Sequence, residues 1–124
     1  MPLYESVIVT RQDITKTQVE KLAQQFCKLI EDQGGNIKRT EYWGLKGLAY
    51  EINKNKKGHY MMLILDTKAN TIAEYERKLS IDEDVIRFVT MKIKTYNENP
   101  SIMMKNVEEN YNDKEKELVK SPKS

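Results

Sequence analysis

Side chains that build enzyme sites and secreted scaffolds are scarce in this 124-residue sequence. Cys27 is the one cysteine, so an internal disulfide is excluded and a reducing compartment is expected. His59 is the one histidine, which excludes a histidine-based metal cluster and leaves a general base with no visible partner. No glycine-rich loop ends in Lys-Ser or Lys-Thr, as a phosphate-binding loop would. The sequence therefore predicts no enzyme, no cofactor, no metal and no small-molecule substrate.

Long apolar runs are also lacking. None approaches the roughly 18–20 apolar residues of a membrane span, and the N-terminus does not show the charged-then-apolar pattern of a secretory signal. We therefore expect neither a membrane partner nor a leader. Apolar residues make up 39% and charged residues 32%, which is typical of a soluble globular domain. The net charge of +2 permits an RNA partner without requiring one.

The composition changes near residue 95. From Thr95 onward the chain has five lysines against six acidic residues, is rich in Asn, Glu, Lys and Ser, and contains Pro100 and Pro122. This part shows weak hydrophobic periodicity, although a short helix around Met104–Tyr111 stays open. The sequence predicts one domain over residues 1–94 and a flexible polar extension over residues 95–124.

Six elements are expected within the domain. Apolar residues recur at helical spacing from Val19 to Ile30, and Thr15 with Gln18 or Thr17 with Glu20 could cap this helix. Gly34-Gly35 should end it. In chain order we expect a strand Tyr4–Thr10, this helix, an extended run Asn36–Ile52 bent near Gly44 and Gly47, a polar turn Asn53–Gly58, a strand His59–Asp66, a helix through Ile72, Tyr75 and Leu79 with Asn70 or Thr71 near its start, and a strand Val85–Ile93.

This order, β-α-β-β-α-β, predicts an α+β fold of the ferredoxin-like type. Right-handed crossovers place both helices on one face of a four-stranded antiparallel sheet, with the first and third strands in the centre. Cys27 falls within the apolar stripe of the first helix, so a buried and unreactive thiol is expected.

The third strand is apolar on both faces, although helices should cover only one of them. His59, Met61, Leu63 and Leu65 alternate with Tyr60, Met62 and Ile64. Seven tyrosines and Trp43 are many for a small core, and exposed aromatic rings near lysines suit contact with protein or RNA. One alternative is a free-standing RNA recognition module that binds single-stranded RNA. Its pattern is matched only in part, by Lys57-Gly58, while Tyr60 and His59 could each stack on a base.

The segment Gly44-Leu45-Lys46-Gly47-Leu48-Ala49-Tyr50-Glu51-Ile52-Asn53-Lys54 resembles the signature of the family of the sixth protein of the bacterial small ribosomal subunit. Tyr4-Glu5, Gly58-His59-Tyr60 and Val85-Ile86-Arg87 with Met91 match the same family in the same order, over about residues 3–105. Two departures are Glu51 where the family usually has proline, and Gly47 where it usually has a basic residue.

The resemblance implies a structural protein of the cytoplasmic ribosome. Such a protein binds 16S rRNA together with a small basic neighbour, the eighteenth protein of that subunit. Arginine among apolar residues favours Arg87 as an anion contact. Candidate RNA contacts are Lys46, Lys54, Lys56, Lys57, Arg87 and Lys92. Candidate contacts with the protein partner are Tyr4, Trp43, Tyr50, His59 and Tyr60.

Overall fold

The elements follow one another in the predicted order. The computed structural model describes residues 1–95, so the predicted extension lies outside the described residues except for Thr95. The possible helix Met104–Tyr111 is also outside them. The elements are β1 (Leu3–Arg11), α1 (Lys16–Asp32), β2 (Asn36–Ile52), β3 (Asn55–Asp66), α2 (Ala69–Ile81) and β4 (Val85–Ile93).

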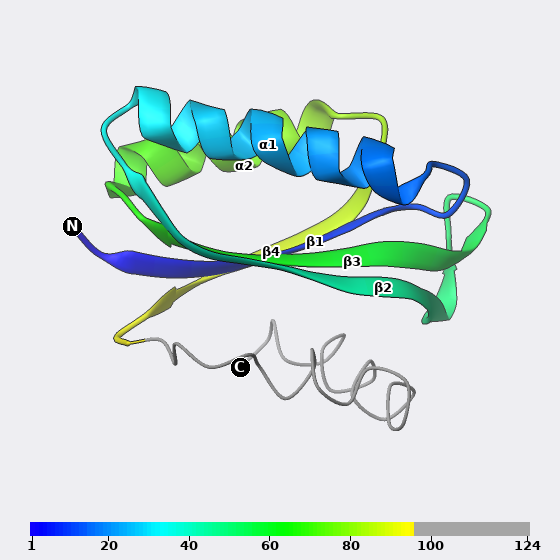
Figure 1. Cartoon of the computed structure of the whole chain (residues 1–124). Coiled ribbons are helices and arrows are strands. Elements are labelled where there is room, and N and C mark those ends of the chain that lie inside the picture. The colour runs from blue at the N-terminus through cyan, green and yellow to red at the C-terminus, as the bar shows by residue number, and fades with distance from the viewer. Residues whose placement is uncertain (96–124) are drawn as a thin grey trace.

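The strands form one antiparallel sheet in the order β2-β3-β1-β4. Both helices lie on the same face of this sheet, as Figure 1 shows. The first and third strands are central, and β2 and β4 are the edges. The predicted ferredoxin-like fold is therefore confirmed.

Helix α1 begins with the first of the two caps that the sequence allowed. The Thr15 hydroxyl accepts from the Gln18 amide at 3.1 Å, and the Gln18 side chain accepts from the Thr15 amide at 2.8 Å. The helix ends at Asp32, and Gly34 follows with a φ of +88°. Gly35 is required by close packing, because a Cβ there would lie 2.7 Å from side-chain atoms of Ile30 and Thr67.

The core lies between the sheet and the helices. The alternation of β1 turns Tyr4, Ser6 and Ile8 toward the helices. Their main apolar neighbours are Leu22, Phe26, Ile30, Leu63, Leu65, Ile72, Tyr75 and Leu79. Cys27 is partly buried against this cluster, and burial raises the pKa of its thiol to about 11, with a further contribution from Glu31. A thiol with such a pKa is almost wholly protonated at neutral pH, which agrees with the predicted unreactive cysteine.

The hairpin between β2 and β3 is tighter than predicted. The expected turn Asn53–Gly58 is wrong over residues 55–58, because β3 already begins at Asn55. Asn53 and Lys54 alone make the turn, with φ values of 47° and 68°. Positive φ at both central residues is the conformation of a type I′ hairpin, and asparagine is among the residues that accept it. The polar segment 53–58 is therefore divided between a two-residue turn and the first residues of β3, of which Lys56 and Lys57 are exposed.

Candidate RNA and protein interface

The face of the sheet opposite the helices carries a second apolar cluster. It consists of Val7, Val9, Trp43, Tyr60, Met62 and Ile64, and we call it the open face. Within residues 1–95 no helix lies against it (Figure 1). The sequence expected β3 to be apolar on both sides, and the two clusters show that it is.

The C-terminal part of β2 bends back toward this open face. Regular pairing of β2 with β3 stops at Gly47, and Leu48 packs against the open-face cluster. Beyond it, the hydroxyl of Tyr50 accepts a hydrogen bond from Nη1 of Arg87 at 3.2 Å. Arg87 belongs to β4, the opposite edge of the sheet. The fold therefore brings together a residue predicted for protein contact and one predicted for RNA contact.

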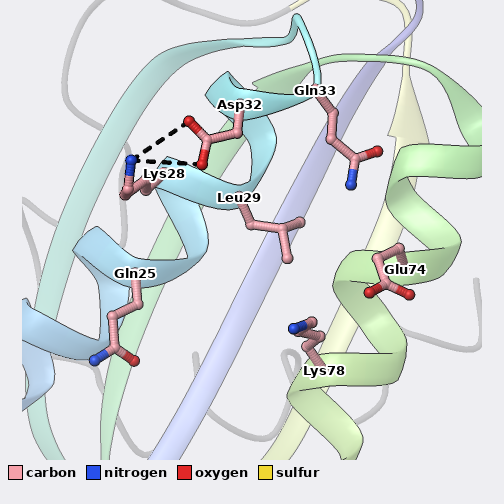
Figure 2. A pocket seen from close by; sticks show the side chains of 7 residues that line it. All are labelled: Gln25, Lys28, Leu29, Asp32, Gln33, Glu74 and Lys78. Atoms are coloured by element: carbon pink, nitrogen blue, oxygen red, sulfur yellow. Dashed lines mark hydrogen bonds and ion pairs between the residues drawn. The ribbon is translucent and has the colours of Figure 1, made fainter.

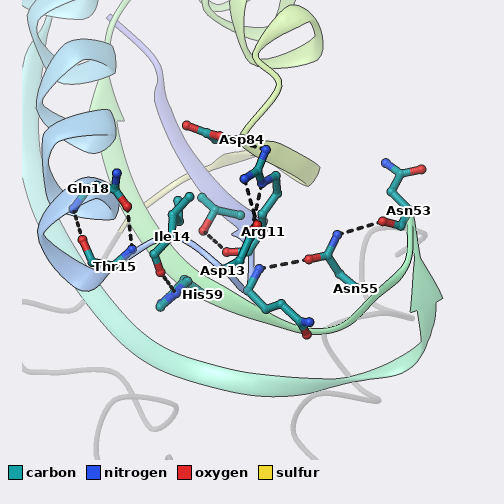
Figure 3. A network of polar contacts seen from close by, with 11 residues as sticks. Arg11, Asp13, Ile14, Thr15, Gln18, Asn53, Asn55, His59 and Asp84 are labelled. Atoms are coloured by element: carbon teal, nitrogen blue, oxygen red, sulfur yellow. Dashed lines mark hydrogen bonds and ion pairs between the residues drawn. The ribbon is translucent and has the colours of Figure 1, made fainter.

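Three predicted RNA contacts lie at the tip of the β2–β3 hairpin. Lys54, Lys56 and Lys57 are all exposed there. Arg11 is a further cation at this end of the sheet, but it forms ion pairs with Asp13 and Asp84 (Figure 3). The distances are 3.0 Å and 3.7 Å. Because two carboxylates already balance Arg11, the hairpin lysines are the better candidates for binding an anion.

The backbone of this tip is held by two residues that the sequence did not indicate. Asn55 Oδ1 accepts from the Gln12 amide at 3.0 Å, and Asn55 Nδ2 donates to the carbonyl of Asn53 at 3.0 Å (Figure 3). Gln12 Oε1 accepts from the amides of Lys56 and Lys57 at 3.2 and 3.0 Å. No spacing rule could have found the role of Gln12, because its partners lie 43 to 45 residues away in the chain.

Two predicted RNA contacts are placed elsewhere. Lys46 is only 1% exposed, so its side chain is buried away from the hairpin lysines, and its contact with RNA stays a prediction. Lys92 is exposed, but it pairs with Tyr4 across the strands and so shares the helix side of the sheet. Arg11, which pairs with Gly58 of the hairpin, lies seven residue steps along β1 from Tyr4. At about 3.4 Å per residue this is about 24 Å, so Lys92 does not belong to the hairpin cluster.

Two of the predicted partner contacts are part of the core side of the sheet. Tyr4 lies in the cluster beneath the helices. His59 is buried, donates from Nε2 to the carbonyl of Ile14 at 2.7 Å, and accepts at Nδ1 from the hydroxyl of Tyr42 at 2.8 Å. Strand alternation turns both rings toward the helices, and their contact with a partner stays a prediction. A base cannot stack on His59 in this position.

Trp43 and Tyr60 lie on the open face, but both are buried in its cluster. Trp43 Nε1 donates to Glu41 Oε1 at 2.8 Å, and Arg39 Nε donates to Glu41 Oε2 at 2.8 Å. Their predicted contact with a partner is therefore not supported by exposure and stays a prediction. Of the five predicted partner contacts, only Tyr50 is well exposed, at 58%.

Glu5 is a carboxylate on the open-face side of β1. Burial raises its pKa, and the nearby charge of Glu41 raises it further. A raised pKa means that the folded state holds the proton more tightly than the unfolded chain does. The ionised Glu5 therefore lowers stability at neutral pH, and this penalty disappears as the pH falls through the folded-state pKa.

We expect Glu5→Gln to raise the urea midpoint of unfolding near neutral pH. The gain should shrink toward zero by about pH 4, where the wild-type carboxyl is itself protonated. Glu51→Gln, the same change at an exposed position of β2, is the matched control and should give no such pH-dependent gain. A gain for Glu5→Gln that is equal at both pH values would show that the ionised carboxylate carries no penalty.

A shallow groove between α1 and α2 is a further concave surface, shown in Figure 2. It measures about 310 Å³ and is lined by Gln25, Lys28, Leu29, Asp32, Gln33, Glu74 and Lys78. Lys28 and Asp32 form an ion pair at 3.5 Å, and Glu74 forms one with Arg77 at 2.9 Å. The lining therefore carries charges of both signs, unlike the hairpin tip with its three lysines. Neither helix of residues 1–95 is long and apolar enough to cross a membrane.

Comparisons with known proteins identify the family. The sequence profile described as Ribosomal protein S6 matches residues 3–92. This chain belongs to the ribosomal protein S6 family. Small ribosomal subunit protein bS6 of Granulibacter bethesdensis is 53% identical to it over 104 residues, which are 84% of this chain and 68% of that protein. The bS6 protein of Dinoroseobacter shibae is 45% identical over 116 residues, which are 94% of this chain and 99% of that protein.

A solved structure supports the same conclusion. The crystal structure of 30S ribosomal protein S6 from Thermotoga maritima matches this fold with a TM-score of 0.70 at 26% identity. The match covers 74% of this chain and 87% of that one. As a member of the S6 family, the chain is a small-subunit ribosomal protein of the cytoplasm and not an enzyme, which confirms the resemblance seen in the sequence.

Proposed function

We propose that this S6 protein binds 16S rRNA through the tip of its β2–β3 hairpin, together with the eighteenth protein of the small subunit. The observation that carries the proposal is the group of three exposed lysines, Lys54, Lys56 and Lys57, on a two-residue turn with a fixed backbone. Lysine ammonium groups attract phosphate without reading bases, which suits a scaffold that recognises the shape of folded RNA.

The small number of charges explains why a second protein is needed. Each phosphate contact contributes modestly, and much of that contribution is lost as salt increases. A net charge of +2 on the chain supplies few such contacts. A joint surface with a more basic neighbour adds contacts without each protein having to bind tightly alone.

Exposed apolar side chains of β2 are the proposed contact with the protein neighbour. Tyr50 is 58% exposed and Leu45 is 47% exposed, and both belong to the edge strand β2. Tyrosine is among the residues that are most enriched at protein interfaces, so Tyr50 is the stronger of the two candidates. Tyr50 also contacts Arg87, so a neighbour bound at Tyr50 would lie beside a candidate RNA contact.

The lysines can be tested with a triple substitution, Lys54, Lys56 and Lys57→Ala. Loss of three phosphate contacts should lower the slope of log affinity against log salt by about 2–3 and weaken 16S rRNA binding roughly tenfold to a hundredfold. Binding of full-length protein should be measured by filter retention at several salt concentrations, with and without the eighteenth protein.

The matched control removes three exposed lysines from the helices, Lys21, Lys28 and Lys78→Ala. It changes the net charge equally but leaves the hairpin intact, because all three lysines belong to α1 and α2. Its slope should stay close to that of the wild type. Equal losses in both variants would show that binding depends on overall charge and not on the hairpin.

A further inference from the structure

The tip of the β2–β3 hairpin extends beyond the end of β1, the central strand that pairs with the rest of β3. The ladder between β1 and β3 ends at the pair Arg11 and Gly58, while β3 continues back to Asn55. On its other side, regular pairing with β2 stops at Gly47 opposite Lys57 and resumes only at Ile52 opposite Asn55. The lysine-bearing part of β3 therefore has an interrupted ladder on both sides.

The side chain of Gln12 bonds to β3 just beyond Arg11, where the backbone pairing of β1 with β3 ends. Its Oε1 accepts from the amides of both Lys56 and Lys57, which extends the support of β1 along the lysine segment. Asn55 completes the arrangement from the hairpin side. It is buried, it accepts from the Gln12 amide, and it donates to the carbonyl of Asn53 within the turn.

We infer that Gln12 and Asn55 are positioning residues that hold the hairpin lysines in place for RNA. This inference rests on the proposed function, since it concerns the same lysines. Both residues act through the backbone of Asn53, Lys56 and Lys57 and need no contact with RNA. Lysine side chains are long and flexible, so a mobile backbone beneath them would add to the ordering cost of binding. Holding that backbone beforehand removes this part of the cost.

The test uses Gln12→Met, which keeps the length of the side chain but removes the acceptor oxygen. Gln12 is exposed, so the fold should survive the change. Hydrogen exchange of the Lys56 and Lys57 amides, followed by NMR, should become about fivefold faster or more. Affinity of the full-length protein for 16S rRNA should fall about threefold to tenfold. The salt slope should stay unchanged, because no cation is lost. Gln24→Met, on the outer surface of α1, is the control and should change none of these quantities.

A second measurement separates positioning from a general structural effect. In the background of the triple lysine variant, Gln12→Met should cause no further loss of RNA affinity, because there are no lysines left to position. An equal loss in that background would overturn the inference.

Other results would also overturn it. If the Lys56 and Lys57 amides of the Gln12→Met variant exchange as slowly as those of the wild type, Gln12 does not hold them. Faster exchange with unchanged RNA affinity would show that holding them does not matter for binding. A salt slope lowered by about 0.7 or more would show that the change removes an ionic contact. Failure of the proposed function is recognised separately, since the triple lysine variant would then bind like the wild type.

Discussion

Tyr75→Ala is expected to lower the free energy of unfolding by about 3–5 kcal/mol, the range for truncating a large buried aromatic residue. The ring is completely buried in the helix-side core and meets Phe26 edge to face, with the ring centroids 5.7 Å apart. Its hydroxyl donates to Ser6 Oγ at 2.7 Å, which ties α2 to the central strand β1. The substitution removes the ring, this hydrogen bond and the contact with Phe26 of α1 together.

Tyr75→Phe separates the ring from the hydroxyl. It should cost about 1–2 kcal/mol, because Ser6 loses one buried hydrogen-bond partner while Thr90 still donates to it at 3.3 Å. Urea denaturation of both variants, followed by circular dichroism, measures the two losses. If the alanine variant loses no more than the phenylalanine variant, the ring packing contributes little and the assigned core is wrong.

The fold was predictable because its signals are local and repeated. Alternation in β3 and helical spacing in α1 each extend over many residues, so no single position decides the element. The order of elements then leaves few topologies, since crossovers between parallel strands of one sheet are right-handed. The capping box at Thr15 and Gln18 was visible for the same reason, because its two residues are three apart in the chain.

The tip of the hairpin was harder to predict. Lys56 and Lys57 look like loop residues by composition, but the side chain of Gln12 supports their backbone from another part of the chain. Hydrogen bonds between a side chain and a distant part of the backbone produce no periodic pattern in the sequence. The lysines themselves could be proposed as RNA contacts, because a cluster of charges is visible in the sequence alone.

The aromatic residues show a different limit. Tyrosine and tryptophan count suggested an exposed surface, but Tyr4, Trp43 and Tyr60 are buried. Composition does not say which rings are accessible, and strand alternation gives the face of the sheet but not what packs on it. Tyr50 differs because it lies in the part of β2 whose regular pairing with β3 is interrupted, and its ring stays exposed.

His59→Ala is expected to lower the free energy of unfolding by about 2–4 kcal/mol, from a buried cavity and from polar atoms left without their partner. The carbonyl of Ile14 loses the donor at 2.7 Å, and the hydroxyl of Tyr42 loses its acceptor at 2.8 Å. Ile14 directly precedes the cap residue Thr15, so the imidazole ties the start of α1 to β3. The sequence assigned His59 to a partner surface, but its burial makes stability the property that the substitution should change.

Two conservative variants can assign this loss to one nitrogen atom. Glutamine places its amide nitrogen near the position of Nε2 and can still donate to Ile14, whereas asparagine reaches only as far as Nδ1. The bond to Ile14 is buried and the bond to Tyr42 only partly so. His59→Gln should therefore lose less stability than His59→Asn, and Tyr42→Phe should lose only about 1 kcal/mol. Denaturation midpoints give this order, and 16S rRNA binding under conditions where every variant is folded should stay within about twofold of the wild type. If a folded His59→Ala protein binds RNA much more weakly than the wild type, the imidazole takes part in RNA binding and the prediction is wrong.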